Sequence, residues 1–367
     1  MQLAGKKNTI QCVSRHIQRS LKNVYNGVPL FVRQEKTSVT IEHTYRRDNV
    51  SISLGDSLDL YRQWKSPTVI ISDGPYGLGS YPGDPPTPER LAECYEPHLR
   101  FWTERSGPQT TLWFWNSELG WANVHTLIQQ FGWEFRNCHI WNKGIGHIAG
   151  NCNTQTIRKF PVTTEVCVQY VRKAEFSVGN RLLTMQEWLR YEWERSGIPL
   201  TKTNEACGTK NAATRKYFTK DHLWYYPPPE AFELLQRYAN KHGHGDGRPY
   251  FSLDGKQPIS VTTWEKMRPK FHCPVGITNV WEEPAVRGTE RIKKLSKCVH
   301  NNQKPLKLIE RCIEASSDVG DVVWEPFGGL CSAAIAAHRL KRVGFSSEIN
   351  TDFFEIAVKR LENYDVF

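Results

Sequence analysis

The sequence predicts an α/β fold of the Rossmann-like type, with a mostly parallel sheet and an inserted helical region. From about residue 50, short β-branched runs alternate with helical stretches, a pattern typical of parallel sheets covered by helices. The alternation breaks down between residues 171 and 278 and returns from residue 279. The chain has 367 residues, and single cores stop growing near about 250 to 300 residues, so two lobes are expected.

The first part of the predicted sheet spans residues 49–170. Thr68-Val69-Ile70-Ile71-Ser72 is the kind of β-branched run that fills a strand buried on both faces. Similar runs predict strands at 51–54, 68–72, 109–114, 135–141 and 164–170, and apolar periodicity predicts helices at 57–64 and 120–131. Residues 1–48 are largely polar and basic, so we expect an N-terminal arm there.

The second part of the predicted sheet spans residues 279–367. It contains predicted helices at 304–316, 332–340 and 353–363 and predicted strands at 321–324 and 342–346. The intervening residues 171–278 are rich in Arg, Lys, Trp and Tyr. We interpret this region as an inserted, mainly helical domain.

Composition favours a polyanionic partner. The net charge is +10 and the isoelectric point is about 9.0, which suits nucleic acid binding through counterion release, although a merely basic soluble enzyme fits the charge equally well. Thirteen Trp, fourteen Tyr and sixteen Phe suit a protein that stacks on an unpaired base.

No apolar run approaches the roughly 20 residues of a membrane helix, no export signal is evident, and the ten cysteines form no C-x-x-C pair. We therefore expect a cytoplasmic protein with reduced thiols and no membrane segment.

The first candidate site follows the strand at 68–72. Asp73-Gly74-Pro75-Tyr76 places a carboxylate beside a backbone carbonyl, so one tight turn offers two hydrogen-bond acceptors. An aromatic amine is a poor nucleophile because its lone pair is delocalised, and two acceptors for its hydrogens would activate it. Tyr76 would offer a ring for an extruded base. A turn of no special purpose is the alternative for this segment taken alone.

The second candidate site follows the strand at 321–324. Glu325-Pro326-Phe327-Gly328-Gly329 precedes an Ala-rich helix, and its glycines let the backbone approach a ligand closely. Glu348 follows the next strand, where acidic residues accept hydrogen bonds from ribose hydroxyls in nucleotide-type sites. An acidic residue there can also serve only as a helix cap.

The order of these segments resembles the β class of DNA amino-methyltransferases, which modify adenine N6 or cytosine N4. In that class the catalytic loop precedes the target recognition region, and the cofactor glycine loop comes last. The resemblance covers most of the chain from about residue 50. The matching segments are 54–56, 72–77, 140–144, 160–165, 279–281, 300–306, 320–329 and 348–349.

The resemblance implies an S-adenosylmethionine-dependent DNA methyltransferase fold and a role for each matching residue. Asp73, Gly74, Pro75 and Tyr76 match the catalytic Asp-Pro-Pro-Tyr motif. The implied cofactor-binding residues are Asp56 near the adenine, Lys304 at the methionine carboxylate, Glu325, Phe327, Gly328 and Gly329 in the glycine loop, and Glu348 at the ribose. No metal is expected.

This chain departs from the family pattern at three places. Gly74 replaces the first Pro of the catalytic motif and removes stiffness, and Glu325 replaces Asp. Leu330 and Cys331 stand where Ser and Gly are usual, and we expect a packing role for Cys331. In this family, Asp at the start of the catalytic motif usually accompanies adenine N6 methylation and Ser cytosine N4 methylation, so Asp73 favours adenine and leaves cytosine as the alternative.

Within the insertion, residues 200–208 and 209–218 resemble a helix-turn-helix around Cys207-Gly208. Asn211, Thr214, Arg215 and Lys216 are expected to face outward and read double-stranded DNA, or to form a solvated basic face that touches only phosphates. The stretch from His242 to Asp246 lacks enough metal ligands and is interpreted as a polar loop.

Other functions remain as alternatives. One is methylation of RNA or of a protein amide, which the large basic insertion disfavours. Another is a non-catalytic DNA-binding protein, which is disfavoured because Asp73 and the glycine loop are intact. A prokaryotic or phage, nucleoid-associated enzyme is expected. The sequence leaves open a homodimer, a cognate restriction endonuclease and an orphan modification role.

Overall fold

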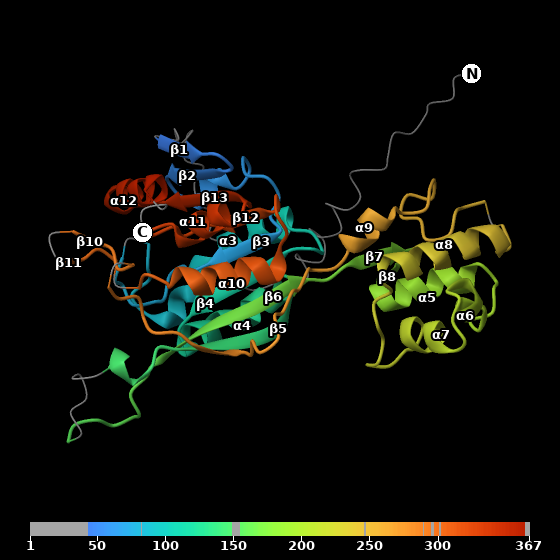
Figure 1. The fold of residues 1–367 in the computed structure, drawn as a ribbon, viewed down its shortest axis with the longest axis horizontal. Helices are drawn as coiled ribbons and strands as arrows, with labels where there is room; N and C mark the ends of the chain where they lie inside the picture. The colour runs from blue at the N-terminus through green and yellow to red at the C-terminus, as the bar shows by residue number, and fades with distance from the viewer. Residues whose placement is uncertain are drawn as a thin grey trace. The chain divides into compact units, whose positions relative to one another are not determined.

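The computed structural model describes residues 43–81, 83–148, 155–245, 247–288, 290–294, 297–300 and 302–363 (Figure 1). Most of the expected arm, residues 1–42, lies outside the described residues. Its last residues differ from the prediction, because β1 (His43–Arg47) pairs antiparallel with β2 (Val50–Leu54). A tight turn joins these two strands, with Asp48 at φ 48.

A nine-stranded sheet organises the part of the chain outside the inserted region. Its strand order is β1-β2-β13-β12-β3-β4-β6-β5-β9. Beyond β1 and β2, its strands are β3 (Val69–Ser72), β4 (Thr111–Asn116), β5 (Trp133–Asn142), β6 (Thr164–Arg172), β9 (Val280–Glu282), β12 (Val322–Glu325) and β13 (Val343–Glu348). Strands β2, β13, β12, β3 and β4 pair in parallel, as predicted.

The far end of the sheet departs from the parallel pattern. Strand β6 is antiparallel to both β4 and β5, and β5 is parallel to β9. Strand β5 therefore runs in the same direction as β4, and its carboxyl end reaches the same edge of the sheet as that of β3. This direction determines which loops surround the site.

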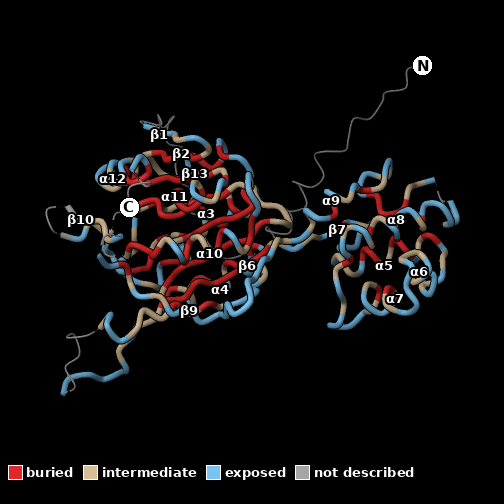
Figure 2. The backbone as a smooth tube through the Cα atoms, viewed as in Figure 1, coloured by how far each residue is buried: buried red, intermediate tan, exposed pale blue. Residues whose placement is uncertain are grey.

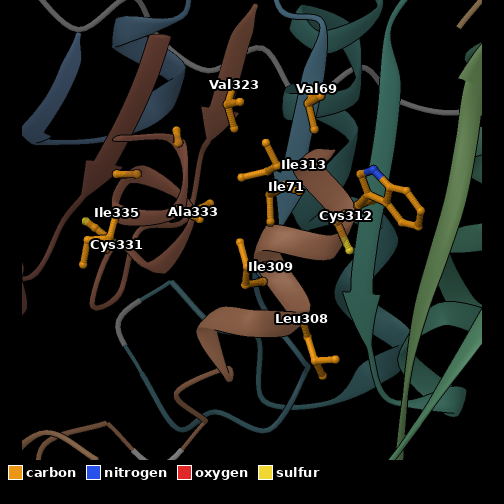
Figure 3. Close-up of a cluster of buried hydrophobic side chains, with 14 of the residues drawn as sticks. Val69, Ile71, Leu308, Ile309, Cys312, Ile313, Val323, Cys331, Ala333 and Ile335 are labelled. Atoms are coloured by element: carbon orange, nitrogen blue, oxygen red, sulfur yellow. The ribbon is translucent and has the colours of Figure 1, made fainter. Parts of the chain in front are cut away.

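Helices cover both faces of the sheet because its central strands are buried on both sides. Val69 and Ile71 of β3 contact the core shared with α10 (Leu306–Ser316), α11 (Ser332–Arg339) and α12 (Thr351–Glu362), part of which Figure 3 shows. Ile70 points the other way, into the core shared with α2 (Ser57–Leu60), α3 (Leu91–Arg105) and α4 (Glu118–Gln130). A short 3-10 turn, η1 (Pro88–Arg90), leads into α3, and η2 (Ile145–His147) follows β5.

The inserted region has its own hydrophobic core. It comprises the hairpin of β7 (Glu175–Val178) and β8 (Arg181–Thr184) and the helices α5 (Met185–Arg195), α6 (Lys202–Ala206), α7 (Ala212–Tyr217), α8 (Pro229–His242) and α9 (Val261–Glu265). Trp188, Trp193 and Trp264 are fully buried within it. Figure 2 shows buried segments of backbone in the interior of this region. The two predicted short helices are present as α6 and α7, and each is shorter than expected.

The remaining described elements are short. Strands β10 (Lys293–Lys294) and β11 (Lys297–Cys298) form a hairpin between β9 and α10. The helix predicted at 57–64 is regular only over α2. Among the described residues, no helix combines the length and apolar character needed to cross a bilayer.

Candidate active site

The predicted site residues meet at one edge of the sheet. Asp56, Glu348, Glu325 and Asp73 stand at or just after the carboxyl ends of β2, β13, β12 and β3, which are four consecutive parallel neighbours. The Gly55 amide donates to the Glu348 carbonyl at 2.9 Å, so the two outer loops are joined directly. Ligands of open α/β sheets bind at this edge.

The predicted catalytic loop, residues 73–76, and the glycine loop are packed against each other. A Cβ atom on Gly74 would lie 2.4 Å from Cδ2 of Phe327 and 2.7 Å from the hydroxyl oxygen of Tyr95. Tyr95 also donates to the Pro75 carbonyl at 3.1 Å, and its ring lies 5.7 Å from that of Phe327. Glycine at position 74 is therefore required by the close approach of Phe327.

Two lysines and two carboxylates form a buried network around Asp73. The Lys304 ammonium lies 2.8 Å from Oδ1 of Asp73 and 3.2 Å from Oε2 of Glu165. Glu165 also pairs with Lys143, and the Tyr76 hydroxyl donates to Asp73 at 3.0 Å and to Glu165 at 3.2 Å. The four charges balance, which allows them to be buried together.

The network sets the ionisation of its members. Burial raises the pKa of Asp73 above its ordinary value, and the adjacent Lys304 only partly offsets this. Burial alone would also raise the pKa of Glu165, but Lys304 and Lys143 bring it below the ordinary value. Burial alone would lower the pKa of Lys304, but Asp73 and Glu165 raise it. Lys304 is therefore a charged ammonium held against the Asp73 carboxylate.

Two residues with predicted ligand contacts also contact other side chains of the site. Lys304 is predicted at the methionine carboxylate of the cofactor, and its ammonium contacts Asp73 and Glu165. Tyr76 is predicted to offer a ring for an extruded base; it is 8% exposed, and the Lys304 ammonium lies 5.1 Å from its ring centroid. The cofactor role of Lys304 and the stacking role of Tyr76 stay predictions. Both side chains hold Asp73 in place in this structure.

Sequence reasoning missed two residues that support the catalytic loop. Asp84 accepts hydrogen bonds from the amides of Tyr76 and Gly77 at 2.9 and 2.7 Å, and also from the amides of Leu78 and Ser80. Asn116, the last residue of β4, donates to the Pro75 carbonyl at 2.9 Å. In the described part of the chain, no hydrogen bond uses the Gly74 carbonyl, which remains available as an acceptor.

The glycine loop is held by its own carboxylate. Glu325 accepts from the Ala333 and Ala334 amides at 2.7 and 3.0 Å and from the Ser346 hydroxyl at 2.8 Å, and its role at the cofactor stays a prediction. Its extra methylene relative to Asp lets it reach the first turn of α11. Burial raises the pKa of Glu325 to about 7.

The backbone of the glycine loop shows the setting of Cys331, another departure from the family pattern. Cys331 has φ 52, in the left-handed region where the family's usual Gly is unstrained. The Cys331 side chain is fully buried, in agreement with the packing role expected for it. A Cβ atom on Gly328 would lie 2.8 Å from the Ser347 carbonyl, so this glycine is needed for close packing.

Glu348, Gly329 and His300 form the part of the site best suited to a ligand. Glu348 accepts from the Gly329 amide at 2.5 Å and from the Asn350 amide at 2.7 Å, which leaves lone pairs on both oxygens. Burial raises the pKa of Glu348. His300 stacks on Tyr81 with ring centroids 4.7 Å apart, and its Nδ1 is buried without a partner among the described residues. Burial lowers the pKa of His300 to about 4, so its imidazole is neutral.

Asp56 begins α2. Its carboxylate accepts from the Leu58 amide at 2.9 Å as a helix cap, at the same edge as Glu348. A role at the cofactor stays a prediction for this residue.

The candidate DNA-reading residues divide into two groups. Asn211, Arg215 and Lys216 are exposed at α7, as expected. Thr214 was expected to face outward, but its hydroxyl bonds to that of Thr203 at 2.6 Å and to the Leu200 carbonyl at 3.1 Å. It therefore joins α7 to α6.

The polar loop after α8 contains His244, whose Nδ1 lies 3.2 Å from the Ser196 carbonyl. Asp246 lies outside the described residues. Among the residues that the structure describes, no three His, Cys, Asp or Glu side chains are grouped to hold a metal ion.

Fold and site together define an α/β protein that places an Asp-Gly-Pro-Tyr loop beside a glycine loop at the carboxyl edge of a mostly parallel sheet. The chain belongs to the N6/N4 family of DNA methylases, whose family model matches residues 68–359.

Individual relatives match over shorter stretches. The type II methyltransferase M.ScaI of Streptomyces caespitosus is 33% identical over 117 residues, which are 31% of this chain and 38% of that protein. M.HpaI of Haemophilus parainfluenzae is 37% identical over 23% of this chain and 26% of its own length. The DNA adenine methyltransferase YhdJ of Escherichia coli (strain K12) is 34% identical over 23% of this chain and 27% of its own length. These alignments span well under half of each relative.

Solved structures are similar at lower identity. A complex of M1.HpyAVI with SAM has a TM-score of 0.46 at 14% identity, covering 85% of this chain and 98% of that one. The cytosine-N4-specific PvuII DNA methyltransferase has a TM-score of 0.48 at 12% identity, covering 85% and 86%.

Proposed function

We propose that this protein is an S-adenosylmethionine-dependent DNA methyltransferase that modifies adenine N6 in duplex DNA. The observation that carries the proposal is the direct packing of the Asp73-Gly74 turn on Phe327 of the glycine loop. This contact brings the two acceptors for an amine and the loop suited to a cofactor to one place. Membership of the DNA methylase family supports the same reaction class.

Asp73 and Gly74 would orient the target amine. Tyr76 and Lys304 both bond to Oδ1 of Asp73, so Oδ2 and the Gly74 carbonyl are the acceptors left for the two amino hydrogens. Accepting both hydrogens turns the nitrogen lone pair out of the ring plane and makes it nucleophilic. Catalysis then comes mainly from positioning, and the released proton passes to solvent.

The residues around the glycine loop fit S-adenosylmethionine. The unused lone pairs of Glu348 suit ribose hydroxyls, and the unpartnered Nδ1 of His300 beside Gly329 offers a further buried polar contact. The proposed binding set is completed by Asp56, Lys304, Glu325, Phe327 and Gly328. When bound, this cofactor supplies an electrophilic methyl group on a positively charged sulfur.

Adenine is the proposed base because Asp73 begins the catalytic loop. The matched segment of YhdJ, named a DNA adenine methyltransferase, agrees with this choice. Because Asp73 is shielded by buried neighbours, a base within a duplex would have to leave the stack to reach it.

The proposed biological setting is restriction-modification in a prokaryotic or phage cytoplasm. The names of M.ScaI and M.HpaI as type II methyltransferases support it, and a cognate restriction endonuclease would then be a partner. Arg215 and Lys216 are the proposed contacts of the inserted region with DNA. Sedimentation would distinguish a homodimer from a monomer.

The test is to incubate the protein with methyl-labelled S-adenosylmethionine and, in parallel, with duplex DNA, RNA and protein. Digested products are then identified by mass spectrometry. Labelled N6-methyladenine from DNA is the expected result. N4-methylcytosine would refute the choice of base, and label in RNA or protein alone would refute the choice of substrate.

A further inference from the structure

The loop between β5 and β6 begins and ends at the catalytic network. Lys143 is the first residue after β5 and pairs with Glu165, the second residue of β6. The Lys143 amide also donates to the Thr163 carbonyl at 2.9 Å, which closes the base of the loop. Because Glu165 contacts Tyr76, the loop leaves the sheet at the edge that carries Asp73.

The described parts of this loop, residues 143–148 and 155–163, expose apolar side chains. Phe160 is 96% exposed, and Ile145 and Val162 are also exposed. Burying a phenylalanine side chain is favourable by about 1.5 to 3 kcal/mol, so folding alone gives no reason for Phe160 to point into water. Pro161 restricts the backbone of Phe160 to extended conformations, which keeps the segment from collapsing into a helical turn.

The charge of the same loop identifies its partner. Residues 143–163 contain three Lys or Arg residues and no Asp or Glu. Arg158 and Lys159 are exposed directly before Phe160. An exposed aromatic ring beside two cations suits a nucleic acid, since phosphates attract the cations and bases stack on the ring.

We propose that residues 155–163 contact DNA, with Phe160 stacking into the duplex beside the target base while Arg158 and Lys159 bind flanking phosphates. This inference rests on the proposed function and adds a contact outside the inserted region. Apolar side chains that enter between base pairs separate them, and this eases the exit of a neighbouring base. Phe160 is well placed because it lies five residues before Glu165 of the catalytic network.

The test of the ring compares Phe160→Ala with Phe160→Trp, which keeps a stacking surface. Val319→Ala is the control, because Val319 is 68% exposed and precedes β12, at the opposite edge of the sheet. After the methylated sequence has been mapped with the wild type, kcat/KM is measured on duplexes with a paired or a mismatched target base.

Phe160→Ala is expected to lower kcat/KM on the paired target by about tenfold or more, and by less on the mismatched target, which leaves the stack more easily. Phe160→Trp and Val319→Ala are expected to stay near the wild type. Equal kcat/KM for Phe160→Ala and the wild type would overturn this inference alone. Absence of methylation by the wild type would overturn the proposed function and this inference with it.

The test of the cations is the salt dependence of DNA binding. Each phosphate contact contributes about 0.9 to the slope of log K against log salt concentration. The double variant Arg158→Gln/Lys159→Gln is therefore expected to reduce that slope by about 2. Lys65→Gln, which changes an exposed lysine before β3 at the opposite edge, is expected to leave it unchanged. An unchanged slope in the double variant would overturn the phosphate contacts.

Discussion

Replacing Lys304 by Met tests whether the buried network holds the catalytic carboxylate. The side chain of Lys304 is 1% exposed, and its ammonium lies 2.8 Å from Asp73 and 3.2 Å from Glu165. At an effective dielectric constant of about 20, these separations correspond to attractions of about 6 and about 5 kcal/mol. Desolvation of the ammonium offsets much of this gain, whereas removing one partner leaves a buried charge uncompensated, so we expect Lys304→Met to lower the free energy of unfolding by about 3 to 5 kcal/mol.

The loss of stability caused by Lys304→Met should depend on pH. Lys304 offsets part of the increase that burial causes in the pKa of Asp73, so its removal raises that pKa further. Between the Asp73 pKa of the unfolded chain and the higher Asp73 pKa of the folded variant, the folded variant binds a proton that the unfolded chain releases. The free energy of unfolding of the variant therefore falls as pH rises between these two pKa values. The acid limb of kcat should move to higher pH for the same reason.

Urea unfolding at several pH values measures the stability, and kcat profiles measure the catalytic effect. Asp73→Asn in the Lys304→Met background removes the uncompensated carboxylate and should recover part of the stability. Lys307→Met is the control, because Lys307 pairs with Glu283 at 3.0 Å but is 70% exposed, and exposed pairs contribute little. Equal effects of Lys304→Met and Lys307→Met, with unchanged pH dependence, would refute the assigned role of the network.

Three further changes probe the surrounding structure. Gly74→Ala places a methyl group against Phe327 and should lower the free energy of unfolding by about 1 to 3 kcal/mol in urea denaturation, whereas Gly107→Ala, with nothing within 4 Å, should be nearly neutral. Burial raises the pKa of Glu325 to about 7 in the folded protein, so the free energy of unfolding should fall as pH rises from about 4.5 towards 7. Glu325→Gln should flatten that pH dependence, and the same pH dependence in the variant and the wild type would contradict the raised pKa of Glu325. Arg215→Gln should reduce the salt slope of DNA binding by about 0.9, and an unchanged slope would exclude a phosphate contact.

The buried strands could be predicted from the sequence because their composition matches their surroundings. The run at 68–72 has an apolar β-branched centre, Val69 to Ile71, and β3 lies between two cores that bury its alternate side chains. The helix α3 was missed because Pro97 breaks its pattern, although the folded helix accommodates this proline. Strands β1 and β9 were missed because both are short and lie at the edges of the sheet, where each pairs with a single neighbouring strand.

The loops of the site were found because each follows a buried strand. The contacts within the site were harder to predict, since the Asp73, Glu165 and Lys304 side chains meet only through the tertiary fold. One signal for Glu165 was present, because a carboxylate near the start of the apolar run at 164–170 requires a charged partner when buried.

One error arose from reading side-chain direction from residue type. Thr214 was assigned to an outward face, but its hydroxyl satisfies the packing between α6 and α7. The hydrogen bonds of Glu325 to the first amides of α11 were not predicted, because they depend on the fold around this side chain.

The most direct test of the central claim is methyl transfer by Asp73→Ala compared with the wild type. The assay measures labelled N6-methyladenine in DNA at saturating cofactor, and calorimetry checks that the variant still binds S-adenosylmethionine. Loss of one positioned acceptor should lower kcat by about 10² to 10³-fold while cofactor affinity stays near that of the wild type. Methylation at the wild-type rate by Asp73→Ala would show that the chemistry takes place elsewhere.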